Sequence, residues 1–283
     1  MSQNSSQDNQ TNFMLLKQLL VHQHYQAILS FIEDHPSWRS QRLITLLHLG
    51  HAYVHTDLKT IEDLSGKVDM EYLTKPNLLE RRVYSYAQSL AIKLEMKEYD
   101  DYLRAITPLL VDVLRLVLEA TVFPDLDRYL VEVMKETENE TPIYRGLQWN
   151  EALIESDKNS KIKKTWNRYY GQYFNYSHYV SSSHLLKLVH DYVKNPTILN
   201  LATQMRHIEK YARNIVAHEL IYVDDEWLMH RINMDAKGIH QQIINLINAA
   251  GLNDPKQWQG LSHIQAAIEE ELLTIYTKMM KEE

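Results

Sequence analysis

The sequence predicts an all-α protein. Apolar residues recur at helical spacing along nearly the whole chain, and convincing runs of alternating apolar and polar residues, the pattern of a half-buried strand, are absent. Seven glycines and seven prolines in 283 residues leave few turns, so the elements between them must be long. With 45% hydrophobic residues, the chain can build one large domain or two small ones, each with its own core.

The N-terminal part is predicted to be a disordered tail followed by a short helical segment. The first twelve residues, MSQNSSQDNQTN, are polar and uncharged except for Asp8, so we expect residues 1–12 to be a disordered tail that carries no secretion signal. The chain from residue 12 to 35 indicates one or two helices that end before Pro36, and residues 40–57 indicate another. These helices define an N-terminal helical segment over residues 13–76.

A larger helical domain is expected over residues 77–283. Asn77 can cap a helix that begins at Leu78, and the strongly apolar stretch 103–123 forms a further helix that Pro108 either kinks or begins. The clearest break in the pattern is the acidic stretch 137–150, which contains a proline and a glycine. The helices expected after this break cover residues 181–193, 197–222, 225–251 and the chain that follows Pro255.

Several classes of protein and site are excluded. The chain has no cysteine, so it has no disulfide and no thiolate metal site, which fits a reducing cytoplasm. No apolar run approaches the roughly 18 residues that span a bilayer, so we expect a soluble, cytoplasmic protein without a membrane partner. Glycine-rich phosphate loops and the short motifs of serine hydrolases and zinc proteases are missing, and we expect no cofactor.

One histidine cluster could be taken for a metal site. His48, His51 and His55 lie on one helical face, a spacing that could bind a metal ion. No carboxylate or cysteine joins them locally, and histidine is common in this chain, which has 14. We therefore interpret these three residues as a polar stripe and predict no metal site.

A basic stretch followed by tyrosines is a candidate surface for RNA. The net charge of −7 argues against a general nucleic-acid binder but allows a local basic groove. Cations can neutralise phosphates and exposed rings can stack on unpaired bases. A solvated basic face with tyrosines that fill a core is the alternative, and both interpretations stay open. The residues that the RNA interpretation selects are Lys161, Lys163, Lys164, Arg168, Tyr169 and Tyr173.

The stretch YARNIVAHEL, residues 211–220, contains the candidate catalytic residues. Arginine followed four to six residues later by histidine occurs in this chain no more often than chance predicts, so the spacing alone carries no weight. On a helical projection from Ile208 the apolar residues form one stripe, while Arg213, Asn214 and His218 lie on the other side, with the small Ala217 between them.

That polar face has a plausible chemistry. Asn214 and His218 are neighbours on the helix, so the amide can orient the imidazole. An imidazole can transfer a proton at neutral pH, and a guanidinium can stabilise charge on a phosphate. RNA supplies its own nucleophile, the 2′-hydroxyl, so cleavage needs no metal, and a two-fold dimer would supply two of each group. The alternative is an ordinary wet helix face on which Glu209 and Arg213 form an i,i+4 pair; Glu219 falls within the apolar stripe and is unexplained.

The hexapeptide RNIVAH, residues 213–218, resembles a known family motif. It is similar to the R-N-x-x-A-H form of the R-x4–6-H motif of HEPN ribonucleases, and most of all to the type III-A (Csm-associated) CRISPR group. Segments like 102–118 and 144–150 precede the motif helix in that group. The first seventy residues resemble the helical segment that adjoins the HEPN domain there.

The resemblance implies a homodimer with a composite active site and metal-independent cleavage of single-stranded RNA, in CRISPR antiviral defence. Arg213 would stabilise the phosphate, His218 would transfer protons, and Asn214 would orient the pair. The family normally carries a Rossmann-fold sensor for cyclic oligoadenylate. No part of this sequence alternates strand and helix as that fold requires, so a cyclic oligoadenylate activator is doubtful here. Two alternatives stay open: a non-catalytic helical interaction module, and a HEPN ribonuclease toxin of a toxin–antitoxin pair.

Overall fold

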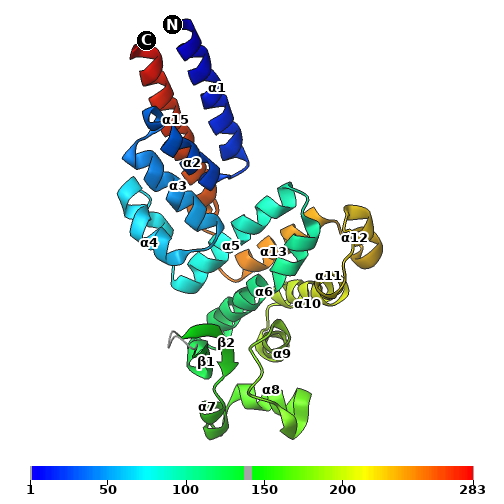
Figure 1. The fold of residues 1–283 in the computed structure, drawn as a ribbon. Helices are drawn as coiled ribbons and strands as arrows, with labels where there is room; N and C mark the ends of the chain where they lie inside the picture. The colour runs from blue at the N-terminus through cyan, green and yellow to red at the C-terminus, as the bar shows by residue number, and fades with distance from the viewer. Residues whose placement is uncertain (1, 137–141, 283) are drawn as a thin grey trace. The chain divides into compact units, whose positions relative to one another are not determined.

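The structure is a computed structural model that describes residues 2–136 and 142–282 (Figure 1). The predicted all-α class is confirmed, because the described residues are mostly helical and their only sheet has two strands. The chain divides into two compact units, residues 1–89 with 254–283, and residues 90–253. In this division the C-terminal helices group with the N-terminal segment, and the domain boundary at residue 77 stays a prediction.

The first unit is a helical bundle whose last helix packs against α1 and α3. Gly50 of α3 faces the ring of Tyr25 from α2, where an added Cβ would lie 2.8 Å from the ring, so these two helices meet at a position that excludes a side chain. The elements of this unit are α1 (Ser2–Val21), α2 (Tyr25–Asp34), η1 (Pro36–Trp38), α3 (Gln41–Val54), α4 (Leu58–Ser65), η2 (Gly66–Val68), η3 (Glu71–Thr74), the start of α5 (Leu78–Glu95), α14 (Pro255–Trp258) and α15 (Gly260–Glu282).

The prediction of a disordered tail is wrong over residues 2–12, which form the first turns of α1. The apolar part of this helix, which includes the buried Leu16 and Leu20, packs in the unit. Once the apolar part of α1 is helical, the unfavourable nucleation step is complete, and each further residue adds a helical hydrogen bond at little cost. A polar composition therefore does not prevent the helix from extending toward the N-terminus.

The second unit is built around α6 (Tyr99–Thr121), which contacts α9, α11 and α13 and contributes twelve buried residues. Pro108 lies inside α6, so it neither begins nor ends the helix. The other elements are η4 (Leu126–Tyr129), β1 (Leu130–Lys135), β2 (Ile143–Trp149), α7 (Glu151–Ser156), α8 (Lys161–Tyr170), η5 (Gly171–Tyr173), α9 (Ser182–Tyr192), α10 (Pro196–Ile208), the π-helix η6 (Glu209–Arg213), α11 (Asn214–His218), α12 (Asp225–Ile232) and α13 (Ala236–Ala249).

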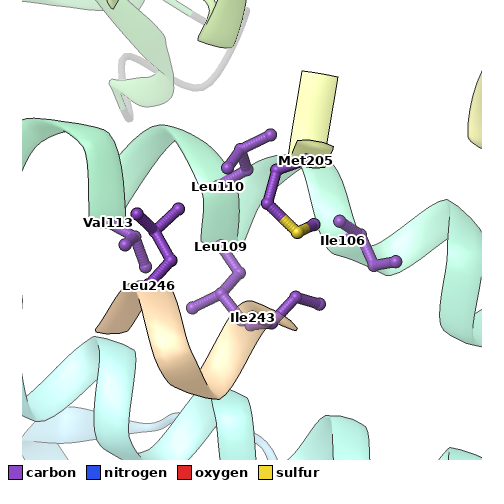
Figure 2. A pocket seen from close by; sticks show the side chains of 7 residues that line it. All are labelled: Ile106, Leu109, Leu110, Val113, Met205, Ile243 and Leu246. Atoms are coloured by element: carbon purple, nitrogen blue, oxygen red, sulfur yellow. The ribbon is translucent and has the colours of Figure 1, made fainter. Parts of the chain in front are cut away.

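Apolar side chains fill the space between α6, α10 and α13. Figure 2 shows seven of them around a small cavity of about 10 Å³. A space of this size with no polar group in its lining stays dry. The lining residues are Ile106, Leu109, Leu110, Val113, Met205, Ile243 and Leu246.

The hairpin of β1 and β2 was not predicted. The two strands pair antiparallel, from Leu130 opposite Trp149 to Lys135 opposite Ile143, with a register shift after Val133. This irregularity and Gly146, whose φ is +140°, break the two-residue alternation that marks a strand in a sequence. Part of the expected break at 137–150 thus forms β2, while residues 137–141 lie outside the described part of the chain.

Two other predicted helices are divided. The helix expected from Leu78 ends at Glu95, and α6 begins at Tyr99, because Lys97 adopts a left-handed conformation with φ of 59°. The helix expected over 225–251 ends at Ile232, where Asn233 has φ of 55°, and restarts at Ala236 behind the capping side chain of Asp235. In both places a residue with positive φ ends the helix, as is common at helix C-termini.

Candidate functional site

The motif segment is not the single α-helix that the sequence predicts over residues 197–222. After α10 ends at Ile208, the chain makes a π-helical turn from Glu209 to Arg213 and then the short helix α11, which ends at His218 (Figure 1). In the π-turn the amide of Asn214 donates to the carbonyl of Glu209, five residues earlier. Single π-turns within α-helices are rare and occur frequently at functional sites.

The predicted core stripe consists of Ile208, Ala212, Ile215, Val216 and Val223, and four of these five are buried, with Val223 5% exposed. Ile208, Ala212 and Val216 are each 1% exposed or less. Ile215 is only half-buried, because the π-turn changes the rotation of the residues that follow it. Glu219, which the projection placed within this stripe, is exposed since the helix has already ended and the chain is extended there.

The three candidate catalytic residues are spread along the motif segment: Arg213 ends the π-turn, Asn214 begins α11 and His218 ends it. Arg213 and Asn214 are half-buried, whereas His218 is exposed in the last turn. Arg213 Nη1 donates to Asn214 Oδ1 at 3.3 Å, so the amide orients the guanidinium rather than the imidazole that the sequence suggested. Arg213 Nε is buried and has no hydrogen-bond partner among the described residues.

The pair of Glu209 with Arg213, which belonged to the alternative interpretation of this face, is replaced by a pair of Glu209 with Arg206. Glu209 is buried, and its carboxylate accepts from Arg206 Nη1 at 2.7 Å. It also accepts from the hydroxyls of Thr107 and Ser182, which lie 102 and 27 residues away in the sequence. Sequence reasoning missed this cluster because no local pattern connects residues at such separations.

Two arginines from other helices hold the main chain of the motif segment. Arg104 of α6 donates from Nε to the carbonyl of Val216 at 3.1 Å, and its Nη1 is held by Asp100 at 2.8 Å. Arg231 of α12 donates from Nε to the carbonyl of Tyr211 at 3.2 Å. Carbonyls in the last turn of a helix have no partner within the helix, so Arg104 satisfies one that α11 leaves open.

Large side chains around the motif face solvent. Tyr211 is 42% exposed, Leu220 100% and Tyr222 85%. Leu220 and Tyr222 follow α11 in the extended segment, and Tyr211 precedes it in the π-turn. Exposed apolar side chains that gather near one another are typical of interaction surfaces.

The basic residues of α8 are largely engaged within the protein. Lys163 pairs with Glu155 at 2.7 Å, and Arg168 pairs with Asp191 at 2.5 Å. Lys161 Nζ lies 5.7 Å from the ring centre of Phe123 and 5.6 Å from that of Tyr192. Intramolecular partners reduce the attraction of these cations for phosphate.

Two residues of the predicted RNA surface stay open. Lys164 is exposed and makes no ion pair among the described residues, and Tyr173 is 90% exposed. The hydroxyl of Tyr169 donates to Asp191 at 3.4 Å. α8 packs mainly against α7, η5 and α9, whereas α11 packs against the π-helix and α6, so the structure does not bring the basic residues to the motif.

Part of the tyrosine-rich stretch belongs to an aromatic core around His184. The rings of Trp149, Trp166, Tyr170 and Phe174 all lie within 6.5 Å of the His184 ring, measured between centroids. Trp149 Nε1 donates to His184 Nδ1 at 3.3 Å, which requires an unprotonated Nδ1. Burial, aided by nearby Lys187 and His178, lowers the pKa of His184 from 6.5 to about 4. His184 is therefore neutral at physiological pH.

The histidine stripe of the first unit, His48, His51 and His55, lies along α3 and at its C-cap. Burial, and then the neighbouring His55 and His48, lower the pKa of His51. Within residues 2–136 and 142–282, no group of three or more histidine, aspartate or glutamate side chains has a geometry that could hold a metal ion. The helices of the same residues include none with the length and apolar character needed to cross a membrane.

The helical bundle is consistent with a HEPN fold, the class of the family model that matches the chain. The chain belongs to the family described as the Cas_Csm6 HEPN domain, whose model matches residues 72–269. It is thus a Csm6-like HEPN protein of type III CRISPR systems, and the resemblance seen in the sequence is confirmed.

A solved structure has a similar fold. Csm6 of Enterococcus italicus, bound to cyclic hexa-2′-fluoro-hexa-dAMP, matches with a TM-score of 0.60 and 13% sequence identity. The match covers 92% of this chain and 56% of that one, so the chain spans little more than half the length of the solved protein. No curated protein matches the sequence.

Proposed function

We propose that this protein is a metal-independent endoribonuclease that cleaves single-stranded RNA at a site formed by Arg213, Asn214 and His218 of two copies of the chain. The observation that carries the proposal is the motif R-N-x-x-A-H, which runs from the last residue of the π-turn through α11, in a member of the Csm6 HEPN family.

The reaction needs two proton transfers and one site of charge stabilisation. A base removes the proton of the RNA 2′-hydroxyl, the oxygen attacks the adjacent phosphorus, and the bond from phosphorus to the 5′-oxygen breaks. An acid gives a proton to that leaving oxygen, and the products carry a 2′,3′-cyclic phosphate and a 5′-hydroxyl. The exposed His218 imidazole exchanges protons, and the Arg213 guanidinium, oriented by Asn214, stabilises the extra charge on the phosphate.

A second copy of the chain completes this chemistry. One motif provides a single imidazole, whereas the reaction uses a base and an acid in the same event. Two motifs related by a two-fold axis provide two histidines and two arginines. The exposed Leu220 and Tyr222 beside His218 support the proposal, because a partner would remove them from water.

We assign no binding site for a cyclic oligoadenylate activator to the described residues. The solved Csm6 of Enterococcus italicus is bound to a cyclic hexanucleotide analogue, but this chain matches only 56% of that protein. The sheet in the described residues is one antiparallel hairpin, whereas the sensor fold needs parallel strands that alternate with helices.

The experiment that tests the proposal measures cleavage of an unstructured RNA in EDTA by the wild type, Arg213→Ala and His218→Ala, together with the solution mass of each. We expect EDTA-resistant cleavage by a wild-type dimer and a loss of about 10²-fold or more in each variant. Equal cleavage by His218→Ala would overturn the assignment of the site. A monomer without EDTA-resistant cleavage would instead identify a non-catalytic helical interaction module.

A further inference from the structure

A buried carboxylate lies at the start of the π-turn that precedes the motif. Glu209 is 3% exposed, and a buried charge persists in a protein only with partners. Its Oε1 accepts from Thr107 Oγ1 at 3.0 Å, and its Oε2 accepts from Arg206 Nη1 at 2.7 Å. Ser182 Oγ lies 2.7 Å from both carboxylate oxygens. These donors come from α6, α10 and α9, so one side chain links three helices where the helical geometry changes.

The position of Glu209 connects this cluster to the motif through the main chain. Its carbonyl accepts the amide of Asn214, which is the hydrogen bond that defines the π-turn. A turn closed by an i→i+5 bond contains one residue more than an α-turn, and one residue corresponds to about 100° of rotation. Whether residues 209–213 are π or α therefore decides the direction in which Arg213 and His218 point.

A second contact supports the same turn. The carbonyl of Tyr211, inside the π-turn, accepts from Arg231 Nε at 3.2 Å. Two sets of contacts thus hold the turn. The side chain of Glu209 is bound by α6, α9 and α10, and the main chain at Tyr211 is bound by α12.

We propose that Glu209 is a positioning residue of the ribonuclease site, because its carboxylate keeps the turn 209–213 in the π-form and so sets the direction of Arg213 and His218. This inference rests on the proposed function. Glu209 touches no substrate, and its effect on catalysis passes through Asn214 and Arg213. Thr107 and Ser182 belong to the same positioning set, since their hydroxyls hold the carboxylate in place.

The test compares Glu209→Gln with Glu219→Gln, the same chemical change at an exposed glutamate ten residues further along. We expect Glu209→Gln to lower kcat for an unstructured RNA by about tenfold or more, with KM within about twofold of the wild type, because a small misorientation of catalytic groups reduces the rate rather than binding. Glu219→Gln should match the wild type in both constants. Hydrogen exchange over residues 209–218 should be faster in Glu209→Gln and unchanged in Glu219→Gln.

The double variant Thr107→Val, Ser182→Ala removes the two hydroxyl donors to Glu209, while the carboxylate and its bond from Arg206 stay. It should show the same loss of kcat, and it decides the question if Glu209→Gln does not fold. Unchanged kcat in a folded variant, with its melting temperature and solution mass retained, would overturn the positioning role.

The two proposals fail in different ways. An inactive wild type, or an active Arg213→Ala, would overturn the proposed function whatever Glu209 does. In that case hydrogen exchange decides the role of the carboxylate in the turn, and equal exchange over 209–218 in Glu209→Gln and the wild type would overturn it.

Discussion

Substitution of His184 by phenylalanine should remove a specific part of the protein's sensitivity to acid. His184 is 8% exposed within aromatic rings, and burial lowers its pKa from 6.5 to about 4. In the unfolded chain this imidazole takes up a proton below its ordinary pKa, while in the folded protein it stays neutral until about pH 4. The neutral His184 therefore makes its full contribution to the free energy of unfolding above pH 6.5, and this contribution is lost progressively as the pH falls toward 4.

The magnitude follows from the two pKa values. One pKa unit corresponds to about 1.4 kcal/mol, so the full loss is ~3 kcal/mol, of which ~2 kcal/mol occurs between pH 7.5 and pH 5. Phenylalanine keeps a ring in the cluster but cannot titrate. It also leaves Trp149 Nε1 without its acceptor, which lowers stability by ~1–3 kcal/mol at every pH.

The assay is urea unfolding at pH 7.5 and pH 5.0, followed by tryptophan fluorescence. The quantity to compare is the loss of unfolding free energy between the two pH values. It should be smaller by ~2 kcal/mol in His184→Phe than in the wild type, whereas His190→Phe, an exposed position on the same helix, should resemble the wild type. Equal losses in the wild type and His184→Phe would refute the reasoning.

Three further predictions concern packing, RNA binding and association. Gly50→Ala should lower the unfolding free energy by ~1–3 kcal/mol, because its Cβ would lie 2.8 Å from a tyrosine ring, whereas Gly66→Ala, with its nearest atom at 3.7 Å, should leave it within ~0.5 kcal/mol. Lys164→Ala should weaken RNA binding more than Lys163→Ala in a filter-binding assay at low salt, since only Lys163 is held by a carboxylate. Leu220→Arg should raise the dimer dissociation constant by about tenfold or more in analytical ultracentrifugation, because a fully exposed side chain can contribute only through a partner.

A specific result would contradict each of these three predictions. Equal stability of the two glycine variants would mean that α2 and α3 do not approach as described. Equal RNA affinity of the two lysine variants would remove the RNA interpretation of α8. A Leu220→Arg variant that dimerises like the wild type would place the dimer interface elsewhere on the protein.

Many helices were predictable because the residue patterns that stabilise a helix can be recognised in the sequence. Long apolar periodicity predicts α3, α6 and α9, and capping residues such as Ser181 and Asp235 stand where helices begin. The helix ends were less predictable, since Lys97 and Asn233 adopt positive φ without a glycine to signal it. The β1–β2 hairpin was missed because a register shift and Gly146 interrupt its alternation.

The sequence selects candidate site residues but does not give their geometry. The motif singles out Arg213, Asn214 and His218 by sequence alone, and whether they are catalytic stays a prediction. The projection assumed 100° per residue throughout, an assumption that the π-turn invalidates. The partners of Glu209 could not be predicted, because Thr107 and Ser182 meet it only after α6, α9 and α10 have packed together.

The central claim, a composite ribonuclease site that needs both copies of the chain, is tested most directly by subunit mixing. Wild-type protein and inactive His218→Ala are unfolded together in equal amounts and refolded, and cleavage of unstructured RNA in EDTA is compared with that of the same total protein as wild type. If each site needs His218 from both copies, only wild-type dimers are active and the rate falls to about a quarter. A rate of about half would show that each chain acts alone, and it would contradict the account.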